Sequence, residues 1–173
     1  MHDSLAQQTL QTPLFTLRGQ THWAKCVKCY DADTIHIVIA FNNTFARFRC
    51  RLQGIDTAEI RSKNPTEKQH ARTARDWLKS VILDRLIVVH CGEFDKYGRL
   101  LVNVYVAGDG DGDGDLAGEQ HGEQQGGGPE KQNIETVDVL SCRNINQELI
   151  ALNYAYVYDG GKRRCFEEWY KET

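Results

Sequence analysis

Carboxylate and guanidinium side chains recur in three separated segments of the chain, each at a place where a strand is expected to end or turn. The segments are D-A-D-T at residues 31–34, Arg51 with D-T-A-E at residues 56–59, and D-K-Y-G-R at residues 95–99. Carboxylates are preferred ligands of hard divalent cations and can orient or deprotonate water. Guanidinium groups bind phosphate and stabilise the negative charge that develops on it. Hydrolysis of a phosphodiester bond needs this combination of groups.

Each group also has a plain structural interpretation when it is taken alone. Asp31 and Asp33 can be turn formers, because Asp hydrogen-bonds its local backbone, and Arg51 can be a solvated strand residue. Tyr156 and Tyr158 lie on one side of an extended segment, where they can stack a base or pack at a sheet edge. These interpretations weaken when the segments are considered together, since all of the groups suit one reaction.

Together the segments resemble the staphylococcal nuclease (thermonuclease-like) family. The resemblance rests on the three segments above, on N-Q-E-L-I at residues 146–150 and on A-Y-V-Y at residues 155–158, which occur in the same order and at similar spacing apart from one insert. It covers roughly residues 22–170, so residues 1–21 are expected to form an N-terminal arm.

The resemblance implies a five-stranded Greek-key β-barrel, the OB-fold, with two to three packed helices. It also implies a calcium-dependent, sugar-nonspecific nuclease that leaves 3′-phosphates. By resemblance, the metal ligands are the carboxylates of Asp33 and Asp56 and the backbone carbonyl of Thr57, and Glu59 is the general base or the residue that orients water. The residues expected to bind the scissile phosphate are Arg51 and Arg99, and those expected to line the nucleotide groove are Lys96, Tyr97, Tyr156 and Tyr158.

The chain departs from the family pattern in two places. Ala58 stands where the family usually has Pro, which loosens the turn that aims Glu59. An acidic, Gly-rich insert at residues 108–133 interrupts a hairpin that is otherwise tight, and its negative charge is expected to repel substrate if it folds over the groove. Neither departure removes a catalytic group.

The alternating Gly and Asp residues of the insert invite comparison with an EF-hand calcium loop. In the register that starts at Asp109, the twelfth position is Gln120, where a bidentate Glu is required, and no helices flank the loop. The sequence therefore favours a solvated, disordered loop over a specific calcium site.

Composition is compatible with a nucleic-acid partner. The 173 residues carry a formal net charge of −3, but residues 107–133 hold seven acidic residues and one basic residue, which leaves 20 basic and 17 acidic residues elsewhere, a net charge of +3. A mildly basic body suits a polyanion. With 40% hydrophobic residues the chain is expected to form one folded domain. No apolar run approaches the roughly 18 residues that cross a bilayer, so no membrane partner is expected.

The six cysteines are informative about the cellular location of the protein and about a possible zinc site. Cys26-Val-Lys-Cys29 has the spacing of a zinc knuckle or redox pair, but no second such pair and no matching histidine pair follows. Reduced, buried thiols are favoured over disulfides and over a zinc site. Because no basic start followed by an apolar block is seen at the N-terminus, an intracellular location is expected, with a secreted mature form left open.

Strand patterns dominate the first half of the chain. Residues 22–30 and 34–41 are expected to be strands joined through a turn at 31–33, and Asn42-Asn43 to be a hairpin turn. In the strand expected at 45–55, one face holds Phe48, Cys50 and Leu52 and the other holds Arg47, Arg49 and Arg51. A turn is expected at 54–59.

Helical periodicity appears at residues 67–83, where Thr66 is the expected N-cap and Glu67 lies in the first turn. Strands at 86–90 and 100–106, a strand at 134–140, a helix at 146–153 and a helical turn near 167–169 complete the pattern. Short strands in hairpins, with helices inserted, favour a small closed barrel.

Three function classes follow from these observations. The first is an active calcium nuclease, expected to act as a monomer on DNA or RNA that is single-stranded or frayed. The second is a catalytically inactive nucleic-acid or protein-binding module on the same barrel, which predicts loss of the acidic residues or arginines that are present here. The third is a calcium buffer or scaffold built around the acidic insert.

Overall fold

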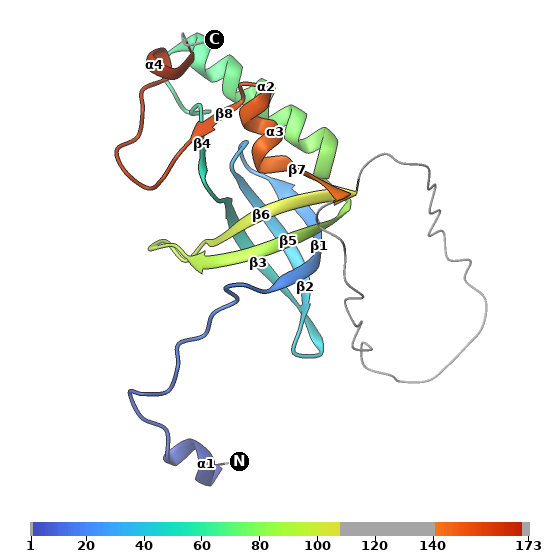
Figure 1. The fold of residues 1–173 in the computed structure, drawn as a ribbon, viewed down its shortest axis with the longest axis vertical. Coiled ribbons are helices and arrows are strands. Elements are labelled where there is room, and N and C mark those ends of the chain that lie inside the picture. Colours follow the sequence, from blue (N-terminus) through green and yellow to red (C-terminus); the bar gives the residue numbers. More distant parts are fainter. Residues whose placement is uncertain (1, 108–140, 171–173) are drawn as a thin grey trace, which may run out of the picture.

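Five strands of the computed structural model close into a barrel (Figure 1), and the structure describes residues 2–107 and 141–170. The barrel strands are β1 Thr21–Cys29, β2 Thr34–Phe41, β3 Thr44–Leu52, β5 Leu86–Phe94 and β6 Leu100–Ala107. Neighbours pair antiparallel in the order β3-β2-β1-β5-β6, and a parallel pairing of β3 with β6 closes the ring. The predicted five-stranded barrel with packed helices is confirmed.

The first hairpin forms where the sequence predicts it. β2 has the predicted bounds, and its odd-numbered residues from Ile35 to Ile39 are buried while the alternate residues are more exposed. Asn42 and Asn43 connect β2 to β3 with φ angles of 49° and 61°. Asn tolerates this left-handed conformation, which matches the twist of a two-residue hairpin.

The strand predicted at 45–55 is wrong at its C-terminal end, because the chain breaks after Leu52. Gly54 has a φ of 77°, which favours glycine, and a separate strand β4, Ile55–Thr57, then pairs antiparallel with β8, Ala155–Val157. The backbone N–H of Tyr158 donates to the carbonyl of Gly54 at 2.9 Å. The predicted turn at 54–59 is therefore partly a short buried strand.

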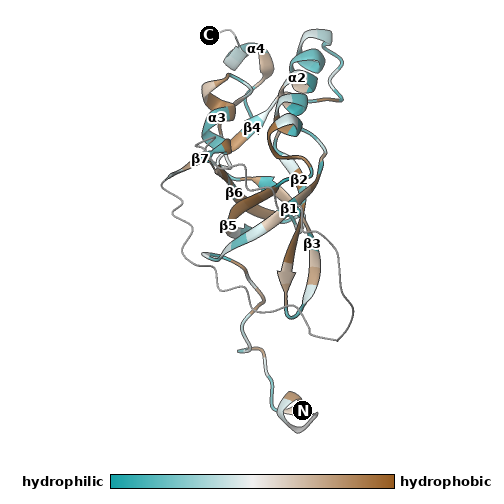
Figure 2. Ribbon diagram, turned by 90° about the vertical axis from the view of Figure 1, so that its right-hand side faces the viewer, coloured by the Kyte–Doolittle hydropathy of each residue, from teal (hydrophilic) through white to brown (hydrophobic). Residues whose placement is uncertain are grey.

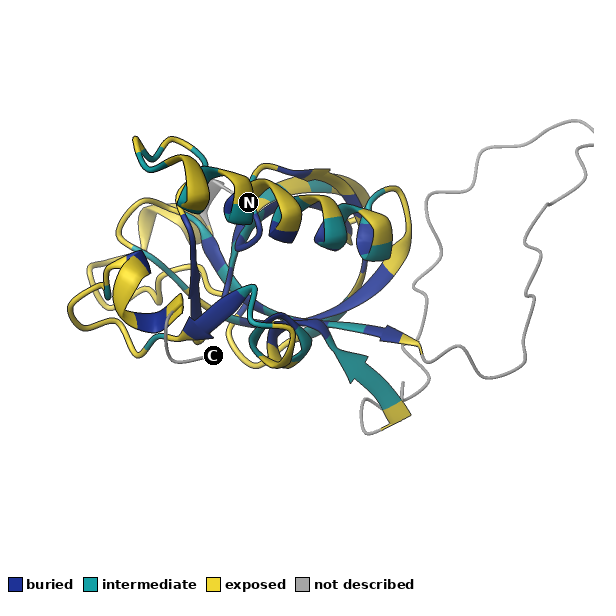
Figure 3. Ribbon diagram, turned by 90° about the horizontal axis from the view of Figure 1, so that it is seen from above, coloured by how far each residue is buried: buried dark blue, intermediate teal, exposed yellow. Residues whose placement is uncertain are grey.

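Helix α2, Pro65–Ile82, lies over one end of the barrel (Figure 3). Its N-cap is Asn64 rather than the predicted Thr66, because the Asn64 side chain accepts from the backbone N–H groups of Thr66 and Glu67 and a proline at the first helical position suits this start. The buried face of the helix carries apolar residues at helical spacing. They are Ala71, Ala74, Leu78 and Ile82.

The hydrophobic core fills the barrel and the space beneath α2. Side chains of all five barrel strands contribute to it, and Figure 2 shows the apolar residues concentrated on the strands while α2 presents a polar outer face. Trp77 is partly buried and packs against this core. A rigid barrel with one capped end can hold side chains of several strands in fixed positions.

The C-terminal elements return to the barrel. β7, Cys142–Asn144, pairs with the end of β6, and α3, Ile145–Ala151, and α4, Phe166–Tyr170, follow it along the chain. The predicted helix at 146–153 and the predicted helical turn near 167–169 are confirmed with small shifts. The strand predicted at 134–140 and the insert at 108–133 lie outside the described residues.

The N-terminal segment extends away from the barrel (Figure 1) and begins with helix α1, His2–Ala6. Residues 7–20 form no strand. Leu17 is fully buried in the core, and the Phe15 ring lies 5.4 Å from Phe41 and 6.1 Å from Phe94. Within the described ranges, no helix has the length and apolar character needed to cross a membrane.

Candidate active site

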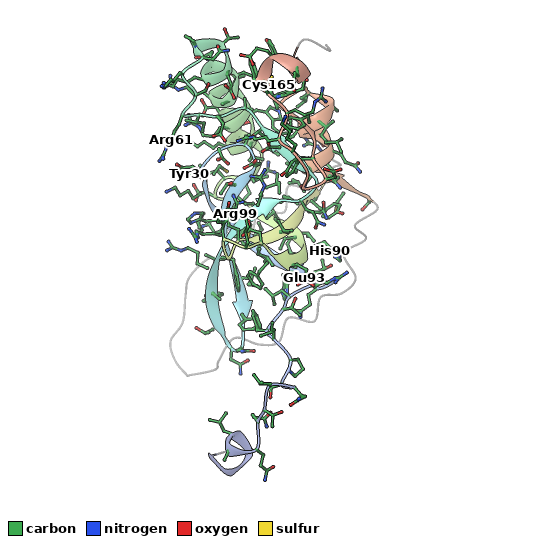
Figure 4. The ribbon with its side chains drawn as sticks, turned by 90° about the vertical axis from the view of Figure 1, so that its left-hand side faces the viewer. Tyr30, Arg61, His90, Glu93, Arg99 and Cys165 are labelled. Atoms are coloured by element: carbon green, nitrogen blue, oxygen red, sulfur yellow. The ribbon has the colours of Figure 1, made fainter. Side chains whose placement is uncertain are left out.

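A cavity of about 290 Å³ opens where β2, β3, β4 and the β5–β6 hairpin meet. Figure 4 shows this side of the molecule, with Arg99 on the face turned to the viewer. Seven of the ten predicted site residues line the cavity, and they come from segments far apart in the sequence. They are Asp33, Arg51, Asp56, Thr57, Glu59, Arg99 and Tyr158.

Asp33 immediately precedes β2, at the end of the D-A-D turn, and its side chain is buried. The side chain of Asp31 accepts from the backbone N–H of Asp33 at 3.3 Å, and the Thr34 hydroxyl donates to Asp33 Oδ1 at 2.8 Å. Burial, together with the negative charge of Asp31, raises the pKa of Asp33 to about 8, although Arg51 opposes this. Burial of the Asp33 carboxyl group therefore affects its pKa more than the attraction of Arg51 does.

Arg51 bridges the two predicted metal-binding carboxylates. Its guanidinium contacts Asp33 Oδ2 at 2.8 Å and Asp56 Oδ1 at 2.7 Å. β3 supplies Arg51 on its outer face, opposite Thr34 of β2 in the sheet register. Burial acts to raise the pKa of Asp56, but hydrogen bonds from Tyr156 and Arg51 and the charge of Arg163 together lower it below its usual range.

Tyr156 is buried beneath the site rather than open to a groove, where the sequence suggested it. Pairing of β8 with β4 places Tyr156 opposite Asp56. Its hydroxyl donates to Asp56 Oδ2 at 2.7 Å, and its ring lies 5.2 Å from that of Trp169. Burial and the Asp56 carboxylate raise the pKa of Tyr156 to about 12. Tyr156 therefore orients Asp56, while Tyr158 lines the cavity.

The D-K-Y-G-R segment forms the turn between β5 and β6. Asp95 accepts from the backbone N–H groups of Tyr97 and Arg99 at 2.8 and 2.9 Å, and Gly98 supplies a φ of 73° that the turn requires. Arg99 Nε lies 2.7 Å from Asp95 Oδ2, and these contacts lower the pKa of Asp95 against the effect of its burial. Arg99 therefore reaches the cavity with its orientation fixed.

Lys96 and Tyr97 stand at the exposed tip of the same turn. Lys96 Nζ lies 5.1 Å from the centre of the Tyr97 ring, and the Arg99 guanidinium lies 5.5 Å from it. Neither Lys96 nor Tyr97 lines the cavity itself. The predicted role of Lys96 and Tyr97 in binding therefore stays a prediction.

Glu59 follows β4 in a loop that α2 holds in place. The Glu59 backbone N–H donates to Glu67 Oε1 at 3.1 Å, and the Ser62 hydroxyl donates to the other Glu67 oxygen. Ala58 is buried against α2 and Tyr156. These contacts fix the turn that the Ala58 substitution was expected to loosen.

Arg163 is a residue of the site that the sequence did not indicate. It lies in the loop between β8 and α4, and its guanidinium contacts Asp56 Oδ2 at 2.5 Å, the Thr57 carbonyl at 2.7 Å and the Glu59 carboxylate. The Glu59 and Asp56 carboxylates raise the pKa of Arg163 against the effect of its burial. The run of three basic residues after two glycines signals a basic loop, but not its target.

The oxygen atoms fit a hard divalent cation. Two carboxylates and one backbone carbonyl converge on the cavity, and each already contacts a cationic group. Mixed carboxylate and carbonyl oxygens suit calcium, which tolerates irregular geometry. Among the described residues, no cluster of three or more His, Cys, Asp or Glu side chains is arranged to bind a metal, so any such site would need the Thr57 carbonyl and solvent.

Basic side chains extend from the cavity along the outer face of the sheet. The register aligns Lys28, His36 and Arg49 across β1, β2 and β3, and Lys25 with Val38 and Arg47 in the next row. Lys28, Arg47 and Arg49 together act with burial to lower the pKa of His36. The basic face predicted from alternation in β3 is confirmed and continues onto β1.

Cys26 and Cys29 face the core together, because a bulge between Cys26 and Lys28 shifts the β1 register. Their sulfur atoms are 3.8 Å apart, close enough for a weak thiol hydrogen bond. Burial and the Cys26 sulfur raise the pKa of the Cys29 thiol.

A barrel with this strand order, together with carboxylates and arginines in one cavity of its wall, defines a protein of the nuclease-like barrel class. Residues 49–172, well over half of the chain, match the family model described as Staphylococcal nuclease homologue, and the protein belongs to this family. It is also 38% identical over 56 residues to the probable endonuclease lcl3 of Emericella nidulans. The matched stretch is 32% of this chain and spans only 20% of that relative.

Proposed function

We propose that the protein is a calcium-dependent nuclease that hydrolyses phosphodiester bonds of DNA, RNA or both and leaves 3′-phosphates. The observation that carries the proposal is the convergence of Asp33, Asp56, Glu59, Arg51 and Arg99 on one cavity. Membership of the staphylococcal nuclease homologue family and the partial match to a probable endonuclease support it.

The chain's own groups divide into three tasks under this proposal. The Asp33 and Asp56 carboxylates and the Thr57 carbonyl would hold calcium, which when bound would offset the charge of the phosphate and favour attack by water. Arg51 and Arg99 bind the phosphate oxygens. Because Arg51 is held by two carboxylates and Arg99 by Asp95, both guanidinium groups are oriented before substrate arrives.

Glu59 acts on the attacking water. Its carboxylate takes a proton as the water oxygen bonds to phosphorus. The bond from phosphorus to the 5′ oxygen then breaks, the phosphate stays on the 3′ oxygen, and the departing 5′ oxygen takes a proton from solvent. Negative charge grows on the phosphate oxygens during this step, where the two arginine forks stabilise it.

The decisive test is a cleavage assay on supercoiled plasmid and on single-stranded RNA. Cleavage is expected with calcium, is expected to be weak with magnesium, and should stop in EDTA. Products should carry 3′-phosphate ends that block extension by a polymerase until a phosphatase removes them. Full activity in EDTA would contradict the calcium requirement, and 5′-phosphate products would contradict the direction of cleavage.

The same assay separates the other function classes. A binding module would shift the RNA in a native gel without cutting it, with or without calcium. A calcium buffer built on the insert would do neither. Glu59→Gln serves as the control for a contaminating nuclease, because activity from the protein itself should fall sharply in that variant.

A further inference from the structure

The Arg163 guanidinium contacts oxygen atoms of Asp56 and Thr57 that the proposed calcium ion would also bind. Its three nitrogen atoms contact Asp56, Thr57 and Glu59, so one side chain from the β8–α4 loop engages two of the three proposed ligands and the proposed base. We propose that Arg163 is an autoinhibitory internal cation that competes with calcium and leaves the site when the metal binds. This inference rests on the proposed function, because it takes Asp56 and Thr57 as calcium ligands.

Competition follows from the shared acceptors. Asp56 Oδ2 and the Thr57 carbonyl lie 2.5 and 2.7 Å from Arg163 nitrogens, so a cation cannot approach the same oxygens from the cavity while the guanidinium stays. Two cations at one pair of oxygens would also repel each other strongly at this separation. Arg163 and the metal therefore exclude each other.

Release of Arg163 leaves the other contacts of the cavity in place. Its side chain is 43% exposed, whereas that of Arg51 is 18% exposed. Arg51 holds Asp33 and the other oxygen of Asp56, so it can stay in place while Arg163 leaves. The two arginines therefore differ in role. Arg51 stays in the cavity when the metal binds, whereas Arg163 leaves it.

The loop that carries Arg163 has a natural place to bend. Gly160 has a φ of 93° and is followed by Gly161, whose carbonyl accepts from the Tyr158 hydroxyl at 2.9 Å. Two adjacent glycines permit large backbone changes. Bending at these glycines can withdraw Arg163 once two contacts are released, the one from Tyr158 to the Gly161 carbonyl and the one from the Arg164 N–H to the Tyr156 hydroxyl at 3.1 Å.

The consequence for metal affinity is quantitative. If only a fraction of molecules have Arg163 out of the site, the apparent calcium dissociation constant is the intrinsic constant divided by that fraction. Arg163→Ala sets the fraction to one. Its calcium affinity should therefore exceed that of the natural chain by about tenfold or more, since several charge-assisted contacts must otherwise be exchanged for solvent.

The test is isothermal titration of the full-length protein with calcium alone, at fixed ionic strength and without nucleic acid. Arg163→Ala is compared with Arg163→Lys and with Lys162→Ala. Lys162 is exposed on the same loop, so its removal takes away the same charge without touching the acceptors. Arg163→Ala should bind calcium most tightly, Arg163→Lys should bind with intermediate affinity, and Lys162→Ala should resemble the natural chain.

Thermal melts give a second measurement, which does not depend on nuclease activity. Without calcium, Arg163→Ala should melt below the natural chain, because Asp56 and Glu59 lose a positive partner. With saturating calcium the difference should shrink or vanish. Lys162→Ala should show neither effect.

The outcomes separate the two proposals. If all four proteins bind calcium at this site with the same affinity, the competition is disproved and the proposed nuclease stands. If Arg163→Ala binds calcium more weakly, Arg163 supports the metal site instead of opposing it, which also overturns the inference. If none of them binds calcium, the metal requirement of the proposed function fails and the competition fails with it.

Discussion

Glu59 combines exposure with a fixed backbone, which suits a group that must exchange protons. Its side chain is 53% exposed, while its backbone N–H is held by Glu67. Glu59→Gln keeps the size of the side chain but removes the basic oxygen. The variant is expected to lower kcat by about 10²–10⁴-fold and to change the dissociation constant of a 3′,5′-bisphosphonucleoside inhibitor much less.

Calcium-dependent rates and inhibitor titrations measure the two quantities separately. Arg99→Lys is the useful comparison, because it keeps the charge but loses the fork and should reduce turnover more than inhibitor binding. Near-normal cleavage by Glu59→Gln would assign the base to another group.

Arg51 neutralises two carboxylates that are almost completely buried. The side chains of Asp33 and Asp56 are 4% and 3% exposed. Arg51→Ala should lower the free energy of unfolding by about 1–3 kcal/mol, because the buried Asp33 loses its guanidinium partner while Asp56 keeps Arg163 and Tyr156. Calcium should restore part of the loss if it binds the same carboxylates.

Arg99→Ala is the matched control for this stability measurement. Asp95, the partner of Arg99, is 15% exposed and so retains more solvent than the two partners of Arg51, and loss of Arg99 should cost about 1 kcal/mol. Urea unfolding of both variants, with and without calcium, gives the comparison. Equal losses for Arg51→Ala and Arg99→Ala would show that the Arg51 bridge contributes no special stability.

The sequence was sufficient to predict most of the side chains that line the cavity, but not which of them contact one another. The motif spacing placed Asp33, Arg51 and Arg99 at strand ends, and all three line the cavity. The spacing did not reveal that Tyr156 turns inward to Asp56, or that Arg163 returns to the same carboxylate, since both contacts join segments a hundred residues apart. Such contacts depend on tertiary packing, which leaves no local signature.

At the scale of elements, the outer face of β3 continues the site as a basic surface. Arg47 and Arg49 are exposed and repeat at the roughly 6.8 Å spacing of alternate strand residues. Arg47→Ala/Arg49→Ala should weaken binding of single-stranded DNA and reduce the slope of log affinity against log salt by about 1.4, which corresponds to two lost phosphate contacts.

Hydrolysis of a short diester substrate should be unaffected by this double variant, because neither arginine lines the cavity. Arg72→Ala/Arg75→Ala removes the same charge from α2 and serves as the control. If both double variants weaken DNA binding equally, net charge rather than the β3 face governs binding.

The contact between α2 and α4 predicts a pH dependence of stability. The rings of Phe166, Trp169 and Tyr170 lie 5.5, 5.4 and 5.1 Å from that of His70, and His70 Nε2 lies 2.9 Å from the Asn153 carbonyl. Its Nδ1 is buried without a hydrogen-bond partner among the described residues. Burial lowers the pKa of His70 from the ordinary 6.5.

Because the folded pKa of His70 lies below the unfolded value, protons bind the unfolded chain more readily. The stability contributed by neutral His70 should be complete above about pH 7 and should decline as the pH falls through about 6.5. His70→Phe should remove this part of the decline. Melting temperatures of both proteins from pH 8 to pH 5 measure it, and parallel curves would exclude His70 as the cause.

The elements themselves were largely predictable, because hydrophobic periodicity marks them locally. β2, α2 and α4 formed close to their predicted places. The errors fell where tertiary contacts override local pattern. Gly54 divides an apparently continuous strand so that β4 can pair with β8, and Asn64 rather than Thr66 caps α2.

At the scale of the whole molecule, the chain is expected to tolerate loss of most of its acidic insert. Ala107 and Cys142 are paired across β6 and β7, so the two ends of the intervening segment are held side by side. Deletion of residues 109–130 should leave the melting temperature nearly unchanged, because loop length affects closure entropy weakly. Activity should stay the same or rise as seven acidic residues are removed.

A second variant separates length from charge. Replacing the same acidic residues by Asn and Gln keeps the length and should reproduce any gain in activity. A large loss of both melting temperature and activity on deletion would show that the segment is structural.

The pairing of β4 with β8 has a consequence for when the protein can act during its own synthesis. Ile55–Thr57 needs Ala155–Val157 as its partner, and Asp56 takes its hydrogen bond from Tyr156. A chain leaves the ribosome from its N-terminus, so Asp33, Arg51 and Glu59 emerge long before the strand that fixes their neighbour. The site is therefore assembled only after residues 155–157 have been synthesised, and a shorter nascent chain carries Asp56 without the tyrosine that orients it.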